Sequence, residues 1–119
     1  MVKIENFRDL NIWKKAMVIV EDIYRITSKF PNYELYGLVS QMRRSAVSLP
    51  SNVAEGFTRK HNKEYTQFLY IALSSSAELE TQIEISKRLG YLDKKSEADL
   101  LEKTNPLSRM IMSLIKLLK

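Results

Sequence analysis

Apolar residues recur at every third or fourth position along four long stretches of this chain, a spacing that is typical of amphipathic helices. The stretches cover about residues 10–29, 36–57, 63–89 and 93–119. No stretch of useful length alternates apolar and polar residues, as a half-buried strand would. Because the chain holds only 3 Gly and 3 Pro among 119 residues, it has few residues that interrupt regular structure. The sequence therefore predicts an all-α protein made of four helices.

Helices of roughly 20 residues that are joined by short loops pack most simply into one bundle. We therefore expect a single domain over residues 1–119, folded as an antiparallel, up-down-up-down four-helix bundle. Side chains that accept a hydrogen bond from a free amide mark the starts of helices. On this basis the expected N-caps are Asp9, Asn62 and either Asp93 or Ser96.

Two prolines lie inside the predicted helices. Pro50 has no amide hydrogen, so the carbonyl of Ala46 loses its partner and a kinked second helix is expected. An Asn-Pro pair at 105–106 predicts a kink or a break in the last helix. Glycines are expected at helix ends in the left-handed conformation, with Gly56 near the end of the second helix and Gly90 directly after the third.

The second helix carries short polar residues where a plain amphipathic helix would carry long charged ones. Buried polar groups need partners, so this stripe is either a buried network or a recognition surface. An Arg–carboxylate network between helices would fix their register while adding little net stability. The members of the expected network are Arg43, Arg44, Ser48, Asn52, Glu55 and Glu78. The alternative is a ligand or phosphate site around Arg43 and Arg44.

Nineteen Lys and Arg oppose 14 Asp and Glu, which gives a net charge of +5. Such an excess is compatible with a polyanionic partner, although a solvated basic surface is the more common outcome. The basic residues form three clusters: Lys14 and Lys15; Arg59, Lys60 and Lys63; Lys87 and Arg88. The second cluster precedes a predicted helix start, which also favours anions, and it is therefore the strongest candidate for binding nucleic-acid phosphates.

Patterns of enzyme chemistry are missing from the sequence. There is no Cys, and the one histidine, His61, lies in a basic linker. A glycine-rich phosphate loop is absent, and the inward carboxylates and Glu-x-x-His pairs of a di-iron bundle are not found. We therefore expect no catalysis, no metal and no cofactor. No apolar run approaches the ~20 residues that span a bilayer, so a cytoplasmic protein without membrane contact is expected.

The last helix is apolar nearly all round, through Leu107, Met110, Ile111, Leu114, Ile115, Leu117 and Leu118. A helix of this kind has to be covered on more than one side, which indicates packing against another subunit. Small side chains at 74–76 in the third helix favour close approach of a neighbour or, alternatively, leave room for a small ligand.

Three long strings of residues carry a resemblance to a known family. They are FRDLNIWKKAM (7–17), GLVSQMRRSAVSLPSNVAEGFTR (37–59) and EYTQFLYIALSSSAELETQIEIS (64–86), followed by LGYL (89–92). The chain resembles the four-helix-bundle proteins encoded within intervening sequences of bacterial 23S rRNA genes. The family pattern has a glycine where Ser74 or Ser75 stands, which is a mild departure.

The resemblance implies a ring-like homopentamer of four-helix bundles. The accessory variability protein of diversity-generating retroelements looks like a relative, and it is understood to be a basic pentamer that engages RNA and a reverse transcriptase. The recurring positions of the family correspond here to Arg43 or Arg44, Ser48, Asn52, Glu55, Gly56, Glu78 and Glu80. The resemblance gives these positions a structural or unknown role.

Two functions remain open from the sequence. The first is a non-enzymatic, homo-oligomeric protein that binds RNA or another nucleic acid, or that links RNA to a protein. The second is a structural or protein-interaction module whose basic charge has no nucleic-acid role. A small-ligand site beside residues 74–76 is a weaker third possibility.

Overall fold

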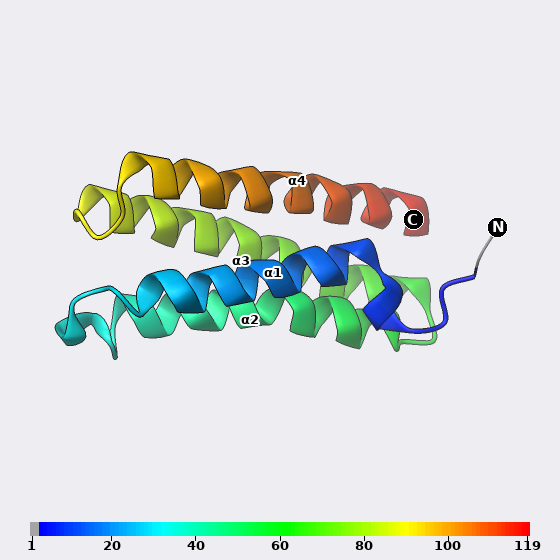
Figure 1. Cartoon of the computed structure of the whole chain (residues 1–119). Coiled ribbons are helices and arrows are strands. Elements are labelled where there is room, and N and C mark those ends of the chain that lie inside the picture. Colours follow the sequence, from blue (N-terminus) through cyan, green and yellow to red (C-terminus); the bar gives the residue numbers. More distant parts are fainter. Residues whose placement is uncertain (1–2) are drawn as a thin grey trace.

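The computed structural model describes residues 3–119, and these residues contain four long helices and no strand. The helices are α1 (Asn11–Thr27), α2 (Leu38–Phe57), α3 (Asn62–Arg88) and α4 (Lys94–Leu118). Short 3-10 turns, η1 (Phe7–Asp9) and η2 (Asn32–Glu34), precede α1 and α2. Figure 1 shows successive helices running in opposite directions along one long axis. The all-α, four-helix prediction is confirmed.

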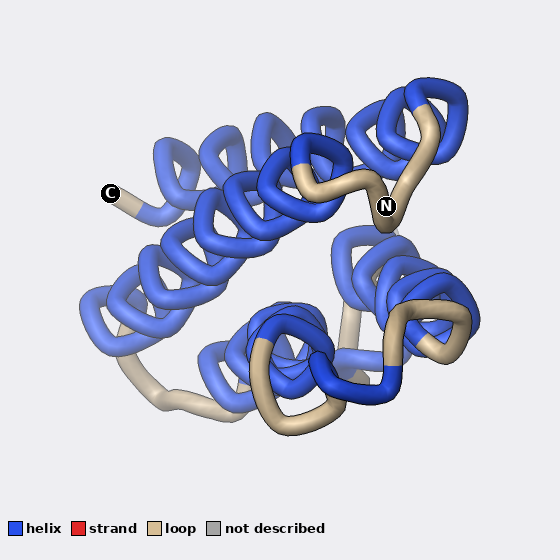
Figure 2. The backbone as a smooth tube through the Cα atoms, turned by 90° about the vertical axis from the view of Figure 1, so that its left-hand side faces the viewer, coloured by secondary structure: helices blue, strands red, loops and turns tan. Residues whose placement is uncertain are grey.

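Each helix packs against two neighbours around a shared core. The neighbouring pairs are α1–α2, α2–α3, α3–α4 and α1–α4, and no Cα atoms of the diagonal pairs lie within 8 Å of each other. Figure 2 shows this arrangement from the end. The molecule measures 45 × 25 × 20 Å. Its largest fully buried side chains come from all four helices and include Ile19, Ile23, Met42, Leu49, Leu69, Leu79, Ile83, Leu107, Ile111 and Ile115.

The ends of α3 and α4 follow the capping rules. Asp93 caps α4, because its Oδ1 accepts a hydrogen bond of 2.7 Å from the Ser96 amide. This bond holds the pKa of the Asp93 carboxyl below its usual range. Gly90 has φ +83°, and the Tyr91 amide donates to the Ser86 carbonyl at 2.8 Å. The expected left-handed glycine at the end of α3 is therefore confirmed.

Two of the expected N-caps are wrong. Asp9 lies in η1, whose cap is Asn6, and the extended Leu10 is the residue that precedes α1. Asn62 is the first residue of α3 and not its cap. Its side-chain amide donates instead to the carbonyl of Leu118 at 3.5 Å, because the end of α4 lies directly beside the start of α3.

Gly56 differs from expectation, and both internal prolines lie inside continuous helices. Gly56 lies buried inside α2 without a positive φ, and a Cβ there would stand 2.9 Å from the Cβ of Phe68. Its role is to let α2 and α3 approach closely. α4 continues through Pro106 without a break, and α2 continues as a helix on both sides of Pro50. The kink at Pro50 stays a prediction.

Candidate nucleic-acid interface

A row of short polar side chains joins α2 to α3, and we call it the polar seam. Ser45 Oγ donates to Glu78 Oε1 at 3.1 Å, and the hydroxyl oxygens of Ser48 and Ser75 lie 2.7 Å apart. Asn52 Nδ2 donates to Ser48 Oγ at 2.8 Å and to the Ser48 carbonyl at 2.9 Å. Three expected network residues, Ser48, Asn52 and Glu78, therefore meet here. Every contact in the seam is a neutral or singly charged hydrogen bond rather than an Arg–carboxylate pair.

The other three expected members of the network lie outside the polar seam. Successive residues of a helix are about 100° apart, so Arg43 turns toward α1 while Arg44 faces solvent. Arg43 Nε donates to Thr27 Oγ1 at 3.0 Å. Glu55 is exposed, and its carboxylate lies 3.5 Å from the guanidinium of Arg59 in the next turn. The expected buried network is corrected to a smaller, hydroxyl-based one.

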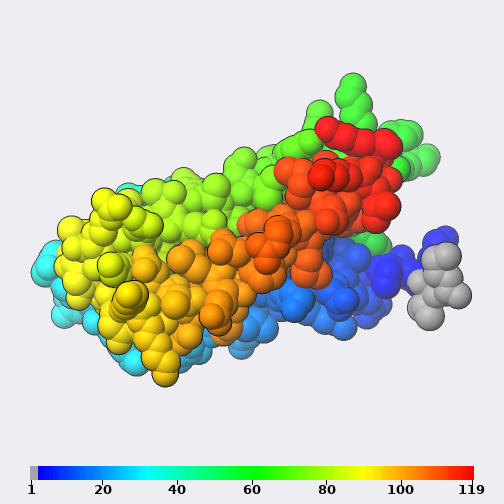
Figure 3. Space-filling view, turned by 90° about the horizontal axis from the view of Figure 1, so that it is seen from above, coloured from blue at the N-terminus to red at the C-terminus, as the bar shows by residue number. Residues whose placement is uncertain are grey.

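The strongest basic cluster of the sequence lies at one end of the bundle. Arg59, Lys60 and Lys63 are all exposed at the corner between α2 and α3. The Asn62–Leu118 hydrogen bond and a 2.8 Å bond from Lys119 Nζ to the Tyr70 hydroxyl bring the end of α4 to the same place. Figure 3 shows this proximity, with the red end of α4 beside green atoms of the corner.

We define the basic end as Arg59, Lys60, Lys63, Lys116 and Lys119, which are all exposed. Lys116 and Lys119 do not stand out in the sequence, because they lie far along the chain from the corner. The signal that identifies them is the topology, since antiparallel packing places the end of a fourth helix beside the start of the third.

Aromatic rings lie beside two cations of the basic end. The guanidinium of Arg59 lies 4.7 Å from the ring centre of Phe68, and the Lys119 ammonium lies 5.2 Å from that of Tyr70. Such contacts contribute about 0.5–1 kcal/mol at exposed sites, enough to bias an orientation without fixing it. The cations remain accessible to a partner.

The other two basic clusters occupy different places. Lys14 and Lys15 are exposed near the start of α1, which lies toward the same end of the molecule as the basic end (Figure 1). Lys87 and Arg88 lie at the opposite end, where α3 finishes. Arg88 is paired with Glu84 at 2.7 Å. The structure therefore groups two clusters at one end and leaves the third apart.

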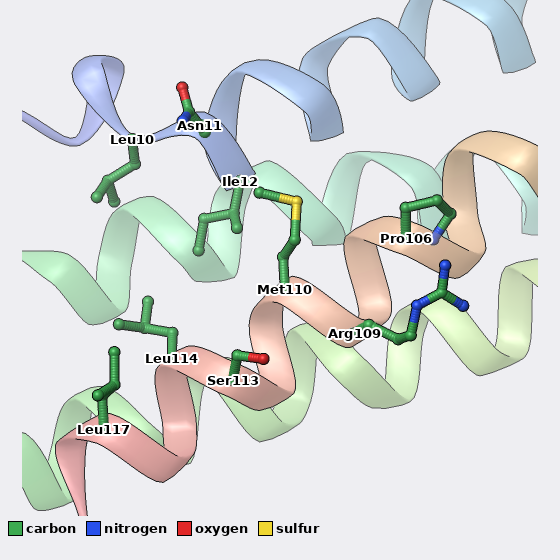
Figure 4. Close-up of a pocket in the computed structure, with 9 residues that line it drawn as sticks. All are labelled: Leu10, Asn11, Ile12, Pro106, Arg109, Met110, Ser113, Leu114 and Leu117. Atoms are coloured by element: carbon green, nitrogen blue, oxygen red, sulfur yellow. The ribbon is translucent and has the colours of Figure 1, made fainter.

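An apolar groove of about 510 Å³ lies between the start of α1 and the second half of α4. In Figure 4, Leu10 and Ile12 point toward Met110, Leu114 and Leu117 across this groove. The side chain of Leu117 is 82% exposed. Some apolar residues of α4 thus lie in the core, and others line an open groove. The groove-lining residues were expected to be covered, and no part of residues 3–119 covers them.

Among residues 3–119, no group of His, Asp and Glu side chains is arranged to hold a metal ion. Within the same residues, no helix is long and apolar enough to cross a bilayer.

The family of the chain follows from its sequence. A family model described as "23S rRNA-intervening sequence protein" matches residues 8–113. The chain belongs to this family. The family part of the resemblance is confirmed, whereas the link to the accessory protein of diversity-generating retroelements stays a prediction. Among curated proteins, none matches this chain.

A solved structure has the same fold. It is the crystal structure of a protein with unknown function from the S23 ribosomal protein family of Bacteroides thetaiotaomicron. The two chains are 19% identical and superimpose with a TM-score of 0.80, over 88% of this chain and 98% of the other. At this identity the likeness establishes the four-helix fold, and the relative is itself described as having unknown function.

Proposed function

We propose that this protein is a non-enzymatic, homo-oligomeric protein that binds RNA through its basic end. The observation that carries the proposal is the gathering of five exposed cations from the α2–α3 corner and the end of α4. Within residues 55–70 and 110–119, only Glu55 and Glu64 oppose them. The result is a local excess of positive charge in a protein whose net charge is already +5.

Exposed lysines and arginines bind the backbone phosphates of a nucleic acid, and these contacts do not depend on the base sequence. Each neutralised phosphate releases counterions, so affinity falls as salt rises. If all five cations bind phosphates, the slope of log K against log[salt] is about −3.5 for a single strand. Affinity then falls about 100-fold between about 50 and 200 mM salt. Ribosomal RNA is the first ligand to test, because the family takes its name from 23S rRNA genes.

The apolar groove supports the homo-oligomeric part of the proposal. Leu114 and Leu117 present apolar surface to water at a place where a second subunit can bury it. The resemblance adds a ring of five subunits as the expected assembly. Light scattering of the 13.9 kDa chain measures the subunit number directly. Leu117→Asp should shift the assembly toward monomers without unfolding them, and a monomeric wild-type protein would contradict the proposal.

Paired charge variants test the RNA site. In Lys60→Gln/Lys63→Gln, loss of two phosphate contacts should reduce the magnitude of the salt slope by about 1.4 for a single-stranded RNA. The matched control is Lys87→Gln/Arg88→Gln, which removes the same charge at the opposite end of the bundle and should change the slope little. Fluorescence anisotropy with a labelled 23S rRNA fragment measures both. Equal effects of the two variants, or binding insensitive to salt, would contradict a localised interface.

A protein-interaction module without a nucleic-acid role is the second candidate, and the groove is the observation that favours it. One experiment distinguishes the two candidate functions. If the wild-type protein assembles but binds no RNA at low salt, the second candidate replaces the first. An adaptor between RNA and a protein requires both activities in the same molecule.

A further inference from the structure

A second hollow, of about 490 Å³, is lined by residues of α1 and α2. They lie late in α1 and early in α2, whereas the basic end lies where α2 ends, at the other end of the bundle (Figure 1). Its lining includes Tyr24 of α1, Tyr36 of the preceding loop, and Ser40, Arg43, Arg44 and Val47 of α2. No acidic residue lines it. Two guanidinium groups therefore stand beside the hollow without a carboxylate in its wall to neutralise them.

Arg43 is held in one orientation before any ligand arrives. Its guanidinium lies 4.6 Å from the ring centre of Tyr24, and its Nε donates to Thr27 Oγ1 at 3.0 Å. Its Nη2 also lies within 3.5 Å of the Tyr24 carbonyl. Because the planar fork is already positioned, little further side-chain entropy is lost when it binds an anion.

The guanidinium of Arg44 and the ring of Tyr36 are accessible to a ligand. Arg44 is exposed and forms no ion pair with any residue in 3–119. The side chain of Tyr36 is 94% exposed, and that of Tyr24 is 43% exposed. Arginine binds phosphate through two parallel hydrogen bonds, and an accessible tyrosine ring stacks on a planar base. The two kinds of group lie in one hollow.

We propose that this hollow binds a nucleoside monophosphate unit, with its phosphate on Arg43 and Arg44 and its base against Tyr36 and Tyr24. The unit is either a free mononucleotide or an unpaired nucleotide of RNA, and only the second case rests on the proposed function. Arg44 and Arg59 are fifteen residues apart in sequence, or about 22 Å along a helix. A mononucleotide in the hollow therefore does not reach the basic end, which separates the two sites experimentally.

The direct test is a titration of the ¹⁵N-labelled full-length protein with AMP at low salt. AMP should shift the amide resonances of Ser40, Arg44 and Val47 in a saturable way. Adenosine and inorganic phosphate, which each supply half of the ligand, should bind at least about tenfold more weakly, since each loses one class of contact. Absence of saturable shifts, or shifts confined to residues 59–63, would overturn the proposal.

Two substitutions and one control identify the contacts. Arg44→Gln removes a charged hydrogen bond and should weaken AMP binding about tenfold. Tyr36→Leu removes a stacking ring but keeps apolar bulk, and it should weaken binding about fivefold. Tyr33→Leu is the matched control, because Tyr33 is an exposed tyrosine of η2, in the same connection between α1 and α2, and lies outside the lining. Unchanged affinity in both Arg44→Gln and Tyr36→Leu would overturn the assignment even if AMP binds.

Competition distinguishes the two sources of the ligand. If the ligand is an unpaired RNA nucleotide, Tyr36→Leu should weaken binding of a single-stranded RNA more than of a duplex, and AMP should compete. If it is a free mononucleotide, AMP binds while RNA affinity is the same in Tyr36→Leu and wild type. AMP binding that survives in Lys60→Gln/Lys63→Gln supports the hollow independently of the basic end. Conversely, loss of AMP binding in that pair alone would place the ligand at the basic end and overturn this assignment.

Discussion

The α2–α3 and α1–α4 pairs are both antiparallel neighbours, yet they pack very differently. α2 and α3 make the most extensive contact in the molecule, with Gly56, Ser45 and Ser75 buried between them. α1 and α4 make the least extensive contact and leave the apolar groove at one end. Side-chain size accounts for the difference, since small residues let two backbones approach and larger ones hold them apart.

The two pairs also satisfy their polar groups in different ways. Two short hydrogen bonds of the polar seam, Ser45–Glu78 and Ser48–Ser75, cross the narrow gap between α2 and α3. α1 and α4 are bridged instead by a long side chain, because Lys103 extends to the buried carboxylate of Asp22. Arg25 supports the same carboxylate at 2.9 Å. In the close pair, two short hydrogen bonds fix the register. In the separated pair, the polar bridge between the helices is one long lysine side chain.

The largest effect is expected when a methyl group is inserted into the close pair. In Gly56→Ala the new Cβ meets the Cβ of Phe68 at 2.9 Å and the Tyr65 carbonyl at 3.2 Å, and neither atom is the end of a flexible side chain. We expect destabilisation of about 1–3 kcal/mol, despite the helix propensity that alanine adds. Urea unfolding measures it, with the exposed Ser51→Ala as control. A more stable Gly56→Ala variant would show that the close approach is not required.

A smaller effect is expected from the long contact between α1 and α4. Lys103→Met keeps the aliphatic stem but leaves Asp22 buried with Arg25 alone. Because the Lys103 side chain is partly exposed, we discount the full cost of a broken buried pair and expect about 1–2 kcal/mol. In Asp22→Asn/Lys103→Met, part of this loss should be recovered, because no charge remains buried without its partner. A double variant less stable than the Lys103→Met single variant would contradict this view.

A double-mutant cycle sharpens the account of the polar seam. Ser48→Ala and Ser75→Ala each leave one hydroxyl of the Ser48–Ser75 pair without its partner, so each single substitution should cost about 1 kcal/mol. The double substitution should cost less than the sum of the two, with a coupling of about 0.5–1 kcal/mol. Thermal unfolding of the four proteins gives the coupling. Strict additivity would indicate that water replaces the hydrogen bond.

The smallest effect lies outside both pairs, at the cap of α4. The pKa of Asp93 is lower in the folded protein, chiefly because of its backbone hydrogen bond from Ser96, so this group stabilises the fold above the unfolded pKa. The contribution is lost as pH falls below about 4 and the carboxylate is protonated. Asp93→Asn keeps an acceptor that does not titrate. The difference in melting temperature between wild type and Asp93→Asn should therefore shrink or reverse in acid, and a constant difference would contradict the assignment.

Local signals predicted the helices well. The spacing of apolar residues identified all four, and Asp93 and Gly90 marked real helix ends because capping depends on a few adjacent residues. The prediction that Asp9 is an N-cap was wrong, because Asn6 caps a 3-10 turn that delays the start of α1. The prediction of a left-handed conformation at Gly56 was wrong, because the role of this glycine is set by Phe68 and Tyr65 on another helix. The residues next to Gly56 in the sequence do not reveal these contacts.

The candidate site was less accessible to sequence reasoning. The cluster at Arg59, Lys60 and Lys63 is visible because its members are adjacent, but Lys116 and Lys119 join it only through helix packing. The direction of Arg43 toward α1, which places it beside the hollow, likewise depends on which face of α2 meets which neighbour. The positions of charged residues along the chain can be read from the sequence. Their positions in space depend on how the helices pack.

The bridge from Lys103 to Asp22 has a consequence for the order of folding. These residues are 81 positions apart, whereas the other three helix pairs connect neighbours in sequence. Loop closure over long separations costs more entropy, so α1–α4 contacts are expected to form after the rate-limiting barrier. Lys103→Met should then accelerate unfolding and leave the refolding rate nearly unchanged, whereas Gly56→Ala should slow refolding. Stopped-flow measurements in urea distinguish the two, and the less extensive α1–α4 pair is expected to set the lifetime of the native state.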